Sequence, residues 1–283
     1  MAENPSLLIS LSHEDQSLAD LRASAPEAKI RITTHLEAPG QTLPAAMMKG
    51  SDVFLCEFLP TNFDDFDQLK WIQLSSAGYA QVLDLPILQR GIRVTNGLGN
   101  FDIAIAEWNV MMMLMCHRHV PEMMDNQRQA VWDRSAKFQA ELREMTVGFY
   151  GYGGIARQTA RLCRSMGLNV WTLTRDGRVK KRENIYLVEG TGDPDGVMCD
   201  RVFSPQDKDE FFGGVDFLIM AMPITPTTTG IIGETELRLL KPSAVFINPG
   251  ISGALADDIV VFSTLLFSCC GLDEDNESEC FCF

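Results

Sequence analysis

Three closely spaced glycines, Gly151, Gly153 and Gly154, indicate a site that could bind phosphate groups. They lie in the segment from Thr146 to Ala156, which reads TVGFYGYGGIA. Gly151 permits a tight turn, and Gly153 lets the backbone approach a pyrophosphate without a Cβ in the way. The helix expected next offers unpaired N–H groups and a partial positive charge to phosphates. The residues predicted to bind a dinucleotide here are Gly151, Gly153, Gly154 and Ile155.

The elements around these glycines have the order that such a site requires. An apolar stretch from Thr146 predicts a buried strand, an amphipathic helix follows the glycines, and Leu168 to Leu173 predicts a second strand. This is the strand–helix–strand unit that holds a dinucleotide. The alternative is a tight turn in some other α/β protein.

The end of the second strand bears on which dinucleotide is bound. An enzyme that prefers NAD usually has Asp or Glu about 20 residues past the glycines, on the ribose 2′-hydroxyl. This chain has Thr174 and Arg175 there, with four more basic residues before position 183. A guanidinium can pair with a 2′-phosphate through two hydrogen bonds, whereas a carboxylate would repel it. We therefore predict NADP, with NAD as the alternative; the basic residues could also be solvated loop charges.

Composition and charge exclude several classes of function. The 283 residues carry a formal net charge of −14, which argues against a nucleic-acid-binding protein. The start has no basic region typical of a secretory signal, and the apolar run 259–270 is shorter than the about 20 residues that span a bilayer. The eight cysteines lack the spacing of a zinc site. We expect a cytoplasmic protein without a metal site or a membrane segment.

The first hundred residues differ in character from the rest. They alternate short apolar strands with helical or irregular connections, a pattern that suits a parallel sheet covered by helices. A long apolar helix over 102–117 opens the second part, and a further amphipathic helix is expected over 122–137, carrying Trp132. We predict a substrate domain over 1–100 and a dinucleotide-binding domain over 101–283. The predicted strands of the first part are Ser6–Ser10, Lys29–Thr33, Val53–Cys56, Trp71–Leu74 and Arg93–Asn96.

With these pieces in order, the chain resembles the D-isomer-specific 2-hydroxyacid dehydrogenases over about residues 50–249. Four separated segments carry the resemblance: LSSAG at 74–78, VTNGLG at 94–99, MAMPITPTTTGIIG at 220–233 and ELRLLKPSAVFIN at 236–248. It implies two doubly wound parallel-sheet α/β domains: a flavodoxin-like substrate domain and a Rossmann coenzyme domain, with an incomplete C-terminus. It also implies a homodimer formed through the coenzyme domains.

The resemblance implies roles for particular residues. The family moves a hydride between a nicotinamide and a small 2-hydroxy or 2-keto acid, such as glyoxylate or hydroxypyruvate. Substrate-binding positions carried over from the family are Ala77, Gly78 and Asn96. Cofactor-binding positions carried over, beside the glycine segment, are Thr174, Arg175, Met222, Pro223, Thr228 and Asp273.

The family's catalytic groups are not matched. The position of its active-site arginine is Ile251, and no histidine follows His119. Losing a general acid–base typically costs about 10²- to 10⁴-fold in rate. Three hypotheses stay open: a family member whose reading frame shifted near Pro249, a catalytically inactive NAD(P)-binding protein that serves as an interaction module, and an enzyme with a rearranged site.

Overall fold

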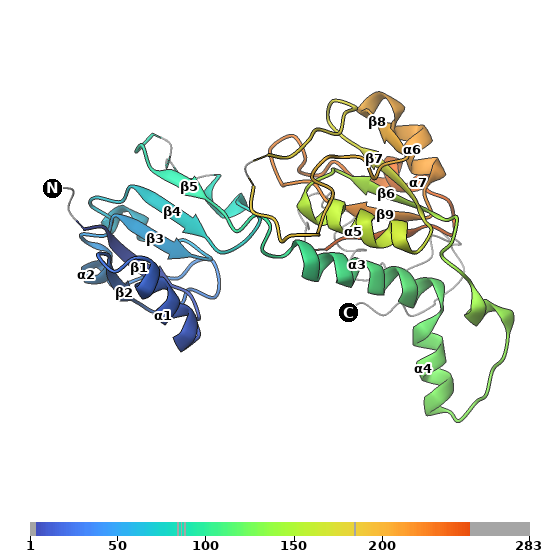
Figure 1. The fold of residues 1–283 in the computed structure, drawn as a ribbon, viewed down its shortest axis with the longest axis horizontal. Helices are drawn as coiled ribbons and strands as arrows, with labels where there is room; N and C mark the ends of the chain where they lie inside the picture. Colours follow the sequence, from blue (N-terminus) through green and yellow to red (C-terminus); the bar gives the residue numbers. More distant parts are fainter. Residues whose placement is uncertain (1–3, 84, 86, 88, 184, 250–283) are drawn as a thin grey trace. The chain divides into compact units, whose positions relative to one another are not determined.

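The computed structural model of the chain describes residues 4–83, 85, 87, 89–183 and 185–249. It divides into two compact units, Met1–Leu98 and Gly99–Phe283, which are treated separately below. In each unit the helices flank one twisted sheet (Figure 1).

The first unit is built on five parallel strands in the order β2-β1-β3-β4-β5. Its buried core is apolar and includes Leu8, Phe54 and Ile72, each fully buried. The order reverses direction between β1 and β3, as in a flavodoxin-like doubly wound sheet. The elements are β1 (Ser6–Ser10), α1 (Asp15–Ser24), β2 (Lys29–Ile32), α2 (Ala45–Met48), β3 (Val53–Cys56), η1 (Phe63–Asp65), β4 (Trp71–Leu74), η2 (Ala80–Val82) and β5 (Arg93–Thr95).

The second unit also has a five-stranded parallel sheet, in the order β10-β9-β6-β7-β8. The chain begins this sheet at its centre with β6, moves outward to β8 and then returns to the other side of β6 through β9 and β10. With β6 counted as the first strand, this is the order 3-2-1-4-5 of the first five strands of a Rossmann fold. The elements are α3 (Asp102–His117), α4 (Val120–Arg128), η3 (Ala136–Gln139), β6 (Thr146–Tyr150), α5 (Gly154–Ser165), β7 (Asn169–Leu173), β8 (Arg201–Phe203), η4 (Pro205–Asp207), α6 (Lys208–Gly214), β9 (Phe217–Met220), α7 (Glu234–Arg238) and β10 (Val245–Ile247).

The predicted fold class, two doubly wound parallel-sheet α/β domains, is confirmed. The strands expected in the first hundred residues form with ends that differ by at most one residue. The sequence did not indicate β8 (Arg201–Phe203), which has only three residues and two exposed side chains. So short a strand forms because its backbone pairs with β7, and this partner is not visible in the local pattern.

The prediction of a helix over 122–137 is wrong in the extent of that helix. Helix α4 spans Val120–Arg128 and begins with a proline in its first turn. The backbone leaves the helix at Gln129, and Ala130 takes a positive φ of 54°. Trp132, placed on this helix by the sequence, lies outside it and is 87% exposed. A left-handed residue ends the helical run, which composition alone does not reveal.

Helix α3 packs along α5 and gives the second unit much of its core. Met112, Met113 and Ala106 of α3 are buried, as are Ala156 and Ala160 of α5. The small alanines allow the two helices to approach closely. The buried Asn109 amide donates a hydrogen bond to Thr159 Oγ1 at 3.1 Å, which fixes the pair in one register.

Three features are absent from the described residues: a membrane-spanning helix, a metal-binding cluster and a disulfide bond. None of their helices combines the length and the apolar character that crossing a bilayer requires. Within the same part of the chain, His, Cys, Asp and Glu side chains form no cluster of three that could hold a metal ion. The cysteines described there, Cys56, Cys116, Cys163 and Cys199, are free thiols.

Candidate coenzyme and substrate sites

The glycine turn lies where three strands of the second sheet end together. Gly151 follows β6, and its N–H donates to Leu173 O at the end of β7 at 2.9 Å. Its φ is +91°, and a Cβ there would lie 2.8 Å from Ala221 O, just after β9. Only glycine fits this backbone and this close approach. The turn therefore occupies the point between β6 and β9 where the strand order reverses, which is where ligands bind in open α/β sheets.

The helix behind the turn presents an open N-terminus. Gly153 is the N-cap residue of α5 in an extended conformation, and no side chain caps the first turn. A Cβ on Gly153 would have Ala221 O as its nearest neighbour, at 3.8 Å, so the approach to this backbone is uncrowded. The next helical residue, Gly154, is buried, while Ile155 is partly exposed. Bare amides at the start of a twelve-residue helix suit the pyrophosphate of a dinucleotide.

A buried carboxyl group beside this helix start was not anticipated from the sequence. Asp102, the first residue of α3, is 7% exposed. A Cβ on Gly154 would lie 1.9 Å from Asp102 Oδ2, so the carboxyl group fills the space that this glycine leaves. Burial raises the pKa of Asp102, and the positive charge of Arg182 opposes that rise. In the sequence Asp102 is only a favourable first residue of a helix, and nothing local predicts its contact with Gly154.

The end of β7 holds the residues expected to choose between NAD and NADP. Thr174 Oγ1 accepts a hydrogen bond from Arg178 N at 3.0 Å and donates to Arg178 O at 3.2 Å. The Thr174 side chain thus closes a turn that leaves Arg175 exposed. Two of the following basic residues pair with carboxylates, Lys180 with Asp176 and Lys181 with Asp195. Those two lysines fit the alternative reading of solvated loop charges.

Three arginines of this basic run differ from the lysines. Arg175, Arg178 and Arg182 make no ion pair within 4.0 Å with any residue described by the structure. We call them the arginine strip. Their guanidinium groups have the charge and geometry to bind phosphate oxygens through two hydrogen bonds.

A second buried polar group, Arg157 of α5, was also missed. Its side chain is 4% exposed and its guanidinium lies 4.9 Å from the centre of the Tyr152 ring. Its Nε donates to Tyr152 O at 3.1 Å, and its two terminal nitrogens donate to Lys180 O, at 2.6 Å, and to Asp193 O. An arginine three residues into a helix normally indicates an exposed side chain. The sequence gives no sign of these distant carbonyl partners.

The loop after β9 is closed by its own threonines. Thr228 Oγ1 donates to Pro223 O at 2.7 Å and accepts from Thr225 N at 2.8 Å. Met222 is buried, and its Cα would be 3.0 Å from a Cβ on Gly151. The structure therefore brings Met222 next to the glycine turn, with Pro223 and Thr228 in the loop that continues from it.

The predicted substrate residues lie together at the carboxyl end of β4 and β5 in the first unit. Asn96 Nδ2 donates to Ala77 O at 2.6 Å, and Gly97 N donates to Ser76 O at 2.8 Å. Gly78 is exposed, and a Cβ there would meet nothing within 4 Å. The loop thus presents an open backbone edge at Gly78.

Two predicted positions, Ile251 and Asp273, lie outside the described residues. Of the chain's four histidines, His117 and His119 lie at the end of α3 and at the start of α4. His117 Nε2 is 3.1 Å from Glu141 O, and its ring packs edge-on against Phe217. The His119 ring packs against Phe138. Both rings serve packing within the second unit.

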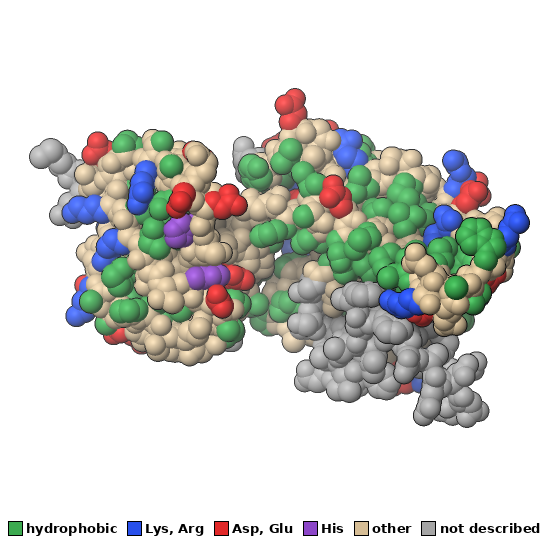
Figure 2. Space-filling model, turned by 90° about the horizontal axis from the view of Figure 1, so that it is seen from below, with side chains coloured by type: hydrophobic (Ala, Val, Ile, Leu, Met, Phe, Trp, Pro, Cys, Tyr) green, Lys and Arg blue, Asp and Glu red, His purple; other side chains and the backbone are tan. Residues whose placement is uncertain are grey.

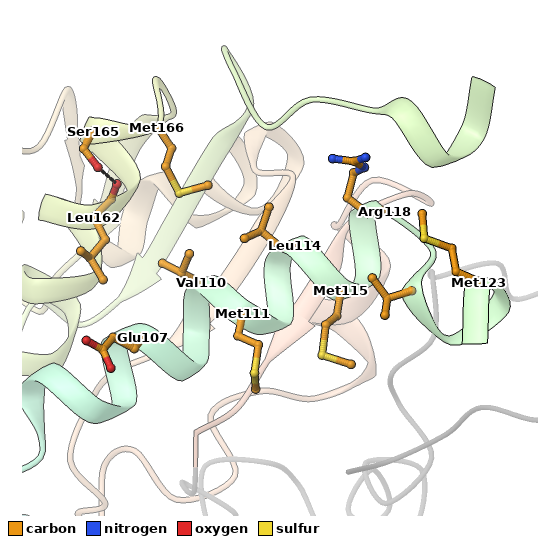
Figure 3. Close-up of a pocket in the computed structure, with 11 residues that line it drawn as sticks. Glu107, Val110, Met111, Leu114, Met115, Arg118, Met123, Leu162, Ser165 and Met166 are labelled. Carbon is orange, nitrogen blue, oxygen red and sulfur yellow. Dashed lines mark hydrogen bonds between the residues drawn. The ribbon is translucent and has the colours of Figure 1, made fainter. Parts of the chain in front are cut away.

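An apolar groove runs along α3 at the opposite end of α5 from the glycine turn. Figure 3 shows Val110, Met111, Leu114 and Met115 of α3 in this groove, with Leu162 and Met166 from the α5 side. Met111 is 45% exposed. Figure 2 shows hydrophobic side chains gathered on this face of the second unit.

Comparison with known proteins identifies the second unit. A family model described as "D-isomer specific 2-hydroxyacid dehydrogenase, NAD binding domain" matches residues 110–262, more than half of the chain. The D-3-phosphoglycerate dehydrogenase of Synechocystis sp. is 28% identical over 195 residues, which cover 69% of this chain and 32% of that protein. The glyoxylate reductase of Thermococcus gammatolerans is 26% identical over 193 residues, which cover 66% of this chain and 53% of that protein. The chain thus spans about a third to a half of the length of these relatives.

Solved structures share the fold over most of the chain. A D-isomer specific 2-hydroxyacid dehydrogenase family protein from Aeromonas salmonicida superposes with a TM-score of 0.71 at 20% identity, covering 93% of this chain and 77% of that one. An NADPH-dependent glyoxylate/hydroxypyruvate reductase from Sinorhizobium meliloti, solved with NADP and sulfate, gives a TM-score of 0.68 at 22% identity, covering 93% and 77%. The chain therefore belongs to the D-isomer specific 2-hydroxyacid dehydrogenase family, and residues 110–262 match the NAD binding domain of that family.

Proposed function

We propose that this chain is an NAD(P)-dependent oxidoreductase that interconverts a small 2-hydroxy acid and the corresponding 2-keto acid. The observation that carries the proposal is the glycine turn at the reversal point of the second sheet. There Gly151 packs closely against the backbone of Ala221, and no side chain caps the N-terminus of α5. That geometry supports binding of a pyrophosphate by backbone amides.

The residues of this chain would divide the work as follows. The first amides of α5 hold the pyrophosphate, and Met222 with the loop through Thr228 flanks the turn on the β9 side. A bound nicotinamide supplies or accepts the hydride. The backbone of Ala77 and Gly78, where Asn96 donates a hydrogen bond to Ala77 O, binds the carboxylate of the acid. These groups bind and orient; none of them is an acid–base.

We propose NADPH as the preferred coenzyme, and glyoxylate or hydroxypyruvate as the acid. The support for NADPH is the absence of Asp or Glu at Thr174 and Arg175, where the arginine strip begins. The support for the acid is the similarity to glyoxylate reductases and to a hydroxypyruvate reductase. Fluorescence titration with NADPH and NADH tests the first point. Turnover of glyoxylate and hydroxypyruvate tests the second.

A second candidate function is coenzyme binding without turnover. One observation favours it: the sequence has Ile251 where the family has its active-site arginine. An isoleucine offers no hydrogen bond to the charge of a 2-keto acid. NADPH binding with no oxidation in the presence of either acid would support this candidate. Measurable turnover would exclude it and would point to another group acting at the carbonyl oxygen.

We further propose that the chain forms a homodimer through the groove along α3. Its apolar lining is continuous and includes Met111, which is 45% exposed, together with Val110, Leu114 and Met115. A continuous apolar surface of this kind marks an interaction site, unlike single exposed apolar residues. Sedimentation analysis should give a dimer of the wild type. Met111→Glu should give a monomer with unchanged coenzyme affinity, because the groove lies away from the glycine turn. A monomeric wild type would contradict the proposal.

A further inference from the structure

The connection between β7 and β8 is folded against α5 rather than extending freely into solvent. Gly192 N donates to Gln158 Oε1 at 2.6 Å, and Arg161 Nε donates to Gly192 O at 3.1 Å. Near the end of the connection, Asp200 pairs with Arg164. Successive turns of α5 therefore anchor this connection along one side of the helix.

Arg157 links the two halves of this connection. Its guanidinium donates to the carbonyl of Lys180, in the basic run, and to the carbonyl of Asp193, in the returning half. The two halves also contact each other directly, because Arg182 N donates to Pro194 O at 2.9 Å. Since Arg157 is 4% exposed, its charge depends on these carbonyls for stabilisation. The basic run is thus fixed to the helix that carries the glycine turn.

Tyr152 connects the same network to the turn itself. It stands between Gly151 and Gly153, and its hydroxyl donates to Asp193 Oδ2 at 2.9 Å. Burial raises the pKa of Tyr152, so the hydroxyl keeps its proton at neutral pH. The Asp193 carboxylate also accepts from Val197 N at 2.9 Å and Met198 N at 3.0 Å. We call Tyr152, Arg157 and Asp193 the latch.

The latch holds a segment with three arginines that make no ion pair with any residue in the part of the chain that the structure describes. Arg175 and Arg178 lie in the turn after β7, where an adenosine ribose is expected. Arg182 lies near enough to Asp102 and Arg157 that its positive charge lowers the pKa of both. The arginine strip therefore extends from the ribose end of the expected site toward the start of α5.

We propose that Tyr152, Arg157 and Asp193 are positioning residues that hold the arginine strip in place for the 2′-phosphate of NADPH. The preference for NADPH over NADH then depends on three side chains that do not contact the coenzyme. They act by holding the connection between β7 and β8 in place. This inference rests on the proposed function as a coenzyme-binding protein. It specifies which residues of this chain create the coenzyme preference.

The test compares the wild-type chain with Tyr152→Phe, which removes only the hydroxyl group of the latch. Tyr150→Phe is the matched control, because that ring lies two residues earlier and packs against Phe212 at 6.0 Å in another cluster. Fluorescence titrations give Kd for NADPH and NADH, and competition with 2′,5′-ADP and 5′-AMP isolates the adenosine end. We expect Tyr152→Phe to raise the Kd for NADPH and for 2′,5′-ADP about tenfold. The Kd for NADH should rise less than about twofold. Tyr150→Phe should leave the ratio of the two affinities unchanged.

A double-mutant cycle separates positioning from general damage. In a background of Arg175→Ala, Arg178→Ala and Arg182→Ala, Tyr152→Phe should no longer change the NADPH to NADH ratio, because the arginine side chains that it positions are gone. Asp193→Asn should reproduce Tyr152→Phe; if it does not fold, the tyrosine variant carries the test alone. If Tyr152→Phe weakens the binding of NADPH and NADH equally, or weakens neither, the proposed role of the latch is wrong. A wild type that binds neither nucleotide would instead overturn the proposed function, and the latch with it.

Discussion

The two loops expected to hold ligands are supported in different ways. The glycine turn of the second unit is fixed by tertiary contacts: Gly151 is pressed against Ala221, and Tyr152 and Arg157 bond to residues more than 20 positions away. The loop at 75–78 of the first unit is held by a few hydrogen bonds to Asn96, Gly97 and Gln81. A turn inside a packed sheet edge tolerates little change, whereas an open loop can adjust to the acid it meets. Substitutions in the two loops should therefore differ sharply in effect.

The largest difference should come from adding one methyl group to each loop. Gly151→Ala places a Cβ 2.8 Å from a backbone carbonyl at a φ of +91°. We expect it to lower the free energy of unfolding by about 1–3 kcal/mol and to weaken NADPH binding about 100-fold. Gly78→Ala meets nothing within 4 Å and should change that free energy by less than about 0.5 kcal/mol. Urea unfolding and NADPH titration measure both; equal effects of the two substitutions would refute the contrast.

A smaller effect is expected where the loop of the first unit is braced. Asn96→Ala removes the hydrogen bond to Ala77 O, which should cost about 1 kcal/mol of stability. Because this contact lies wholly in the first unit, NADPH affinity should be unchanged. Hydrogen exchange should speed up at Ser76, Ala77 and Gly78. If exchange there stays as slow as in the wild type, another contact holds the loop.

Asp102 should give a pH-dependent effect in the second unit. Burial raises its folded pKa above the value of 3.8, so the stability it contributes is present below about pH 4 and is lost as pH rises through the folded pKa. Asp102→Asn keeps the shape of the side chain without its charge. The melting temperature of the variant minus that of the wild type should therefore increase as pH rises from 3.5 to 7. Above the folded pKa of Asp102, NADPH should also bind the variant more tightly than the wild type, because a carboxylate beside the turn repels a pyrophosphate. A constant difference in melting temperature across this range would contradict the assignment.

The smallest effect should come from a surface ion pair of the first unit. Lys70 Nζ lies 2.6 Å from Asp52 Oδ1, with the lysine side chain 76% exposed. This partner and Ser6 N lower the pKa of Asp52, so the stabilisation exists above pH 3.8 and is lost as pH falls through the lowered pKa. Lys70→Met should cost less than about 1 kcal/mol at pH 7, by urea unfolding, and less still in 1 M salt. A cost that is unchanged by salt would show that the lysine acts through packing.

The fold was more predictable from the sequence than the site. Strands such as Ser6–Ser10 and Val53–Cys56 are apolar runs whose burial is decided by local composition, so the pattern finds them. The glycine turn was also predictable, because Gly151 needs a positive φ that few other residues adopt. Both features are encoded within a few neighbouring residues.

What the sequence did not reveal depends on distant partners. The bonds from Arg157 to Lys180 O and Asp193 O join residues 23 and 36 positions apart. Asp102 meets Gly154 only because α3 packs against α5. The early end of α4 depends on the left-handed backbone at Ala130. A single sequence carries no local signal for any of these three features.

The carbonyl partners of Arg157 limit how this protein could be re-engineered. A chimera that replaced the β7–β8 connection with a shorter one would remove the acceptors at Lys180 and Asp193 from a guanidinium that is only 4% exposed. Such an uncompensated charge is strongly destabilising. Exchange of coenzyme preference by loop grafting should therefore succeed only when Tyr152 and Arg157 are replaced in the same step.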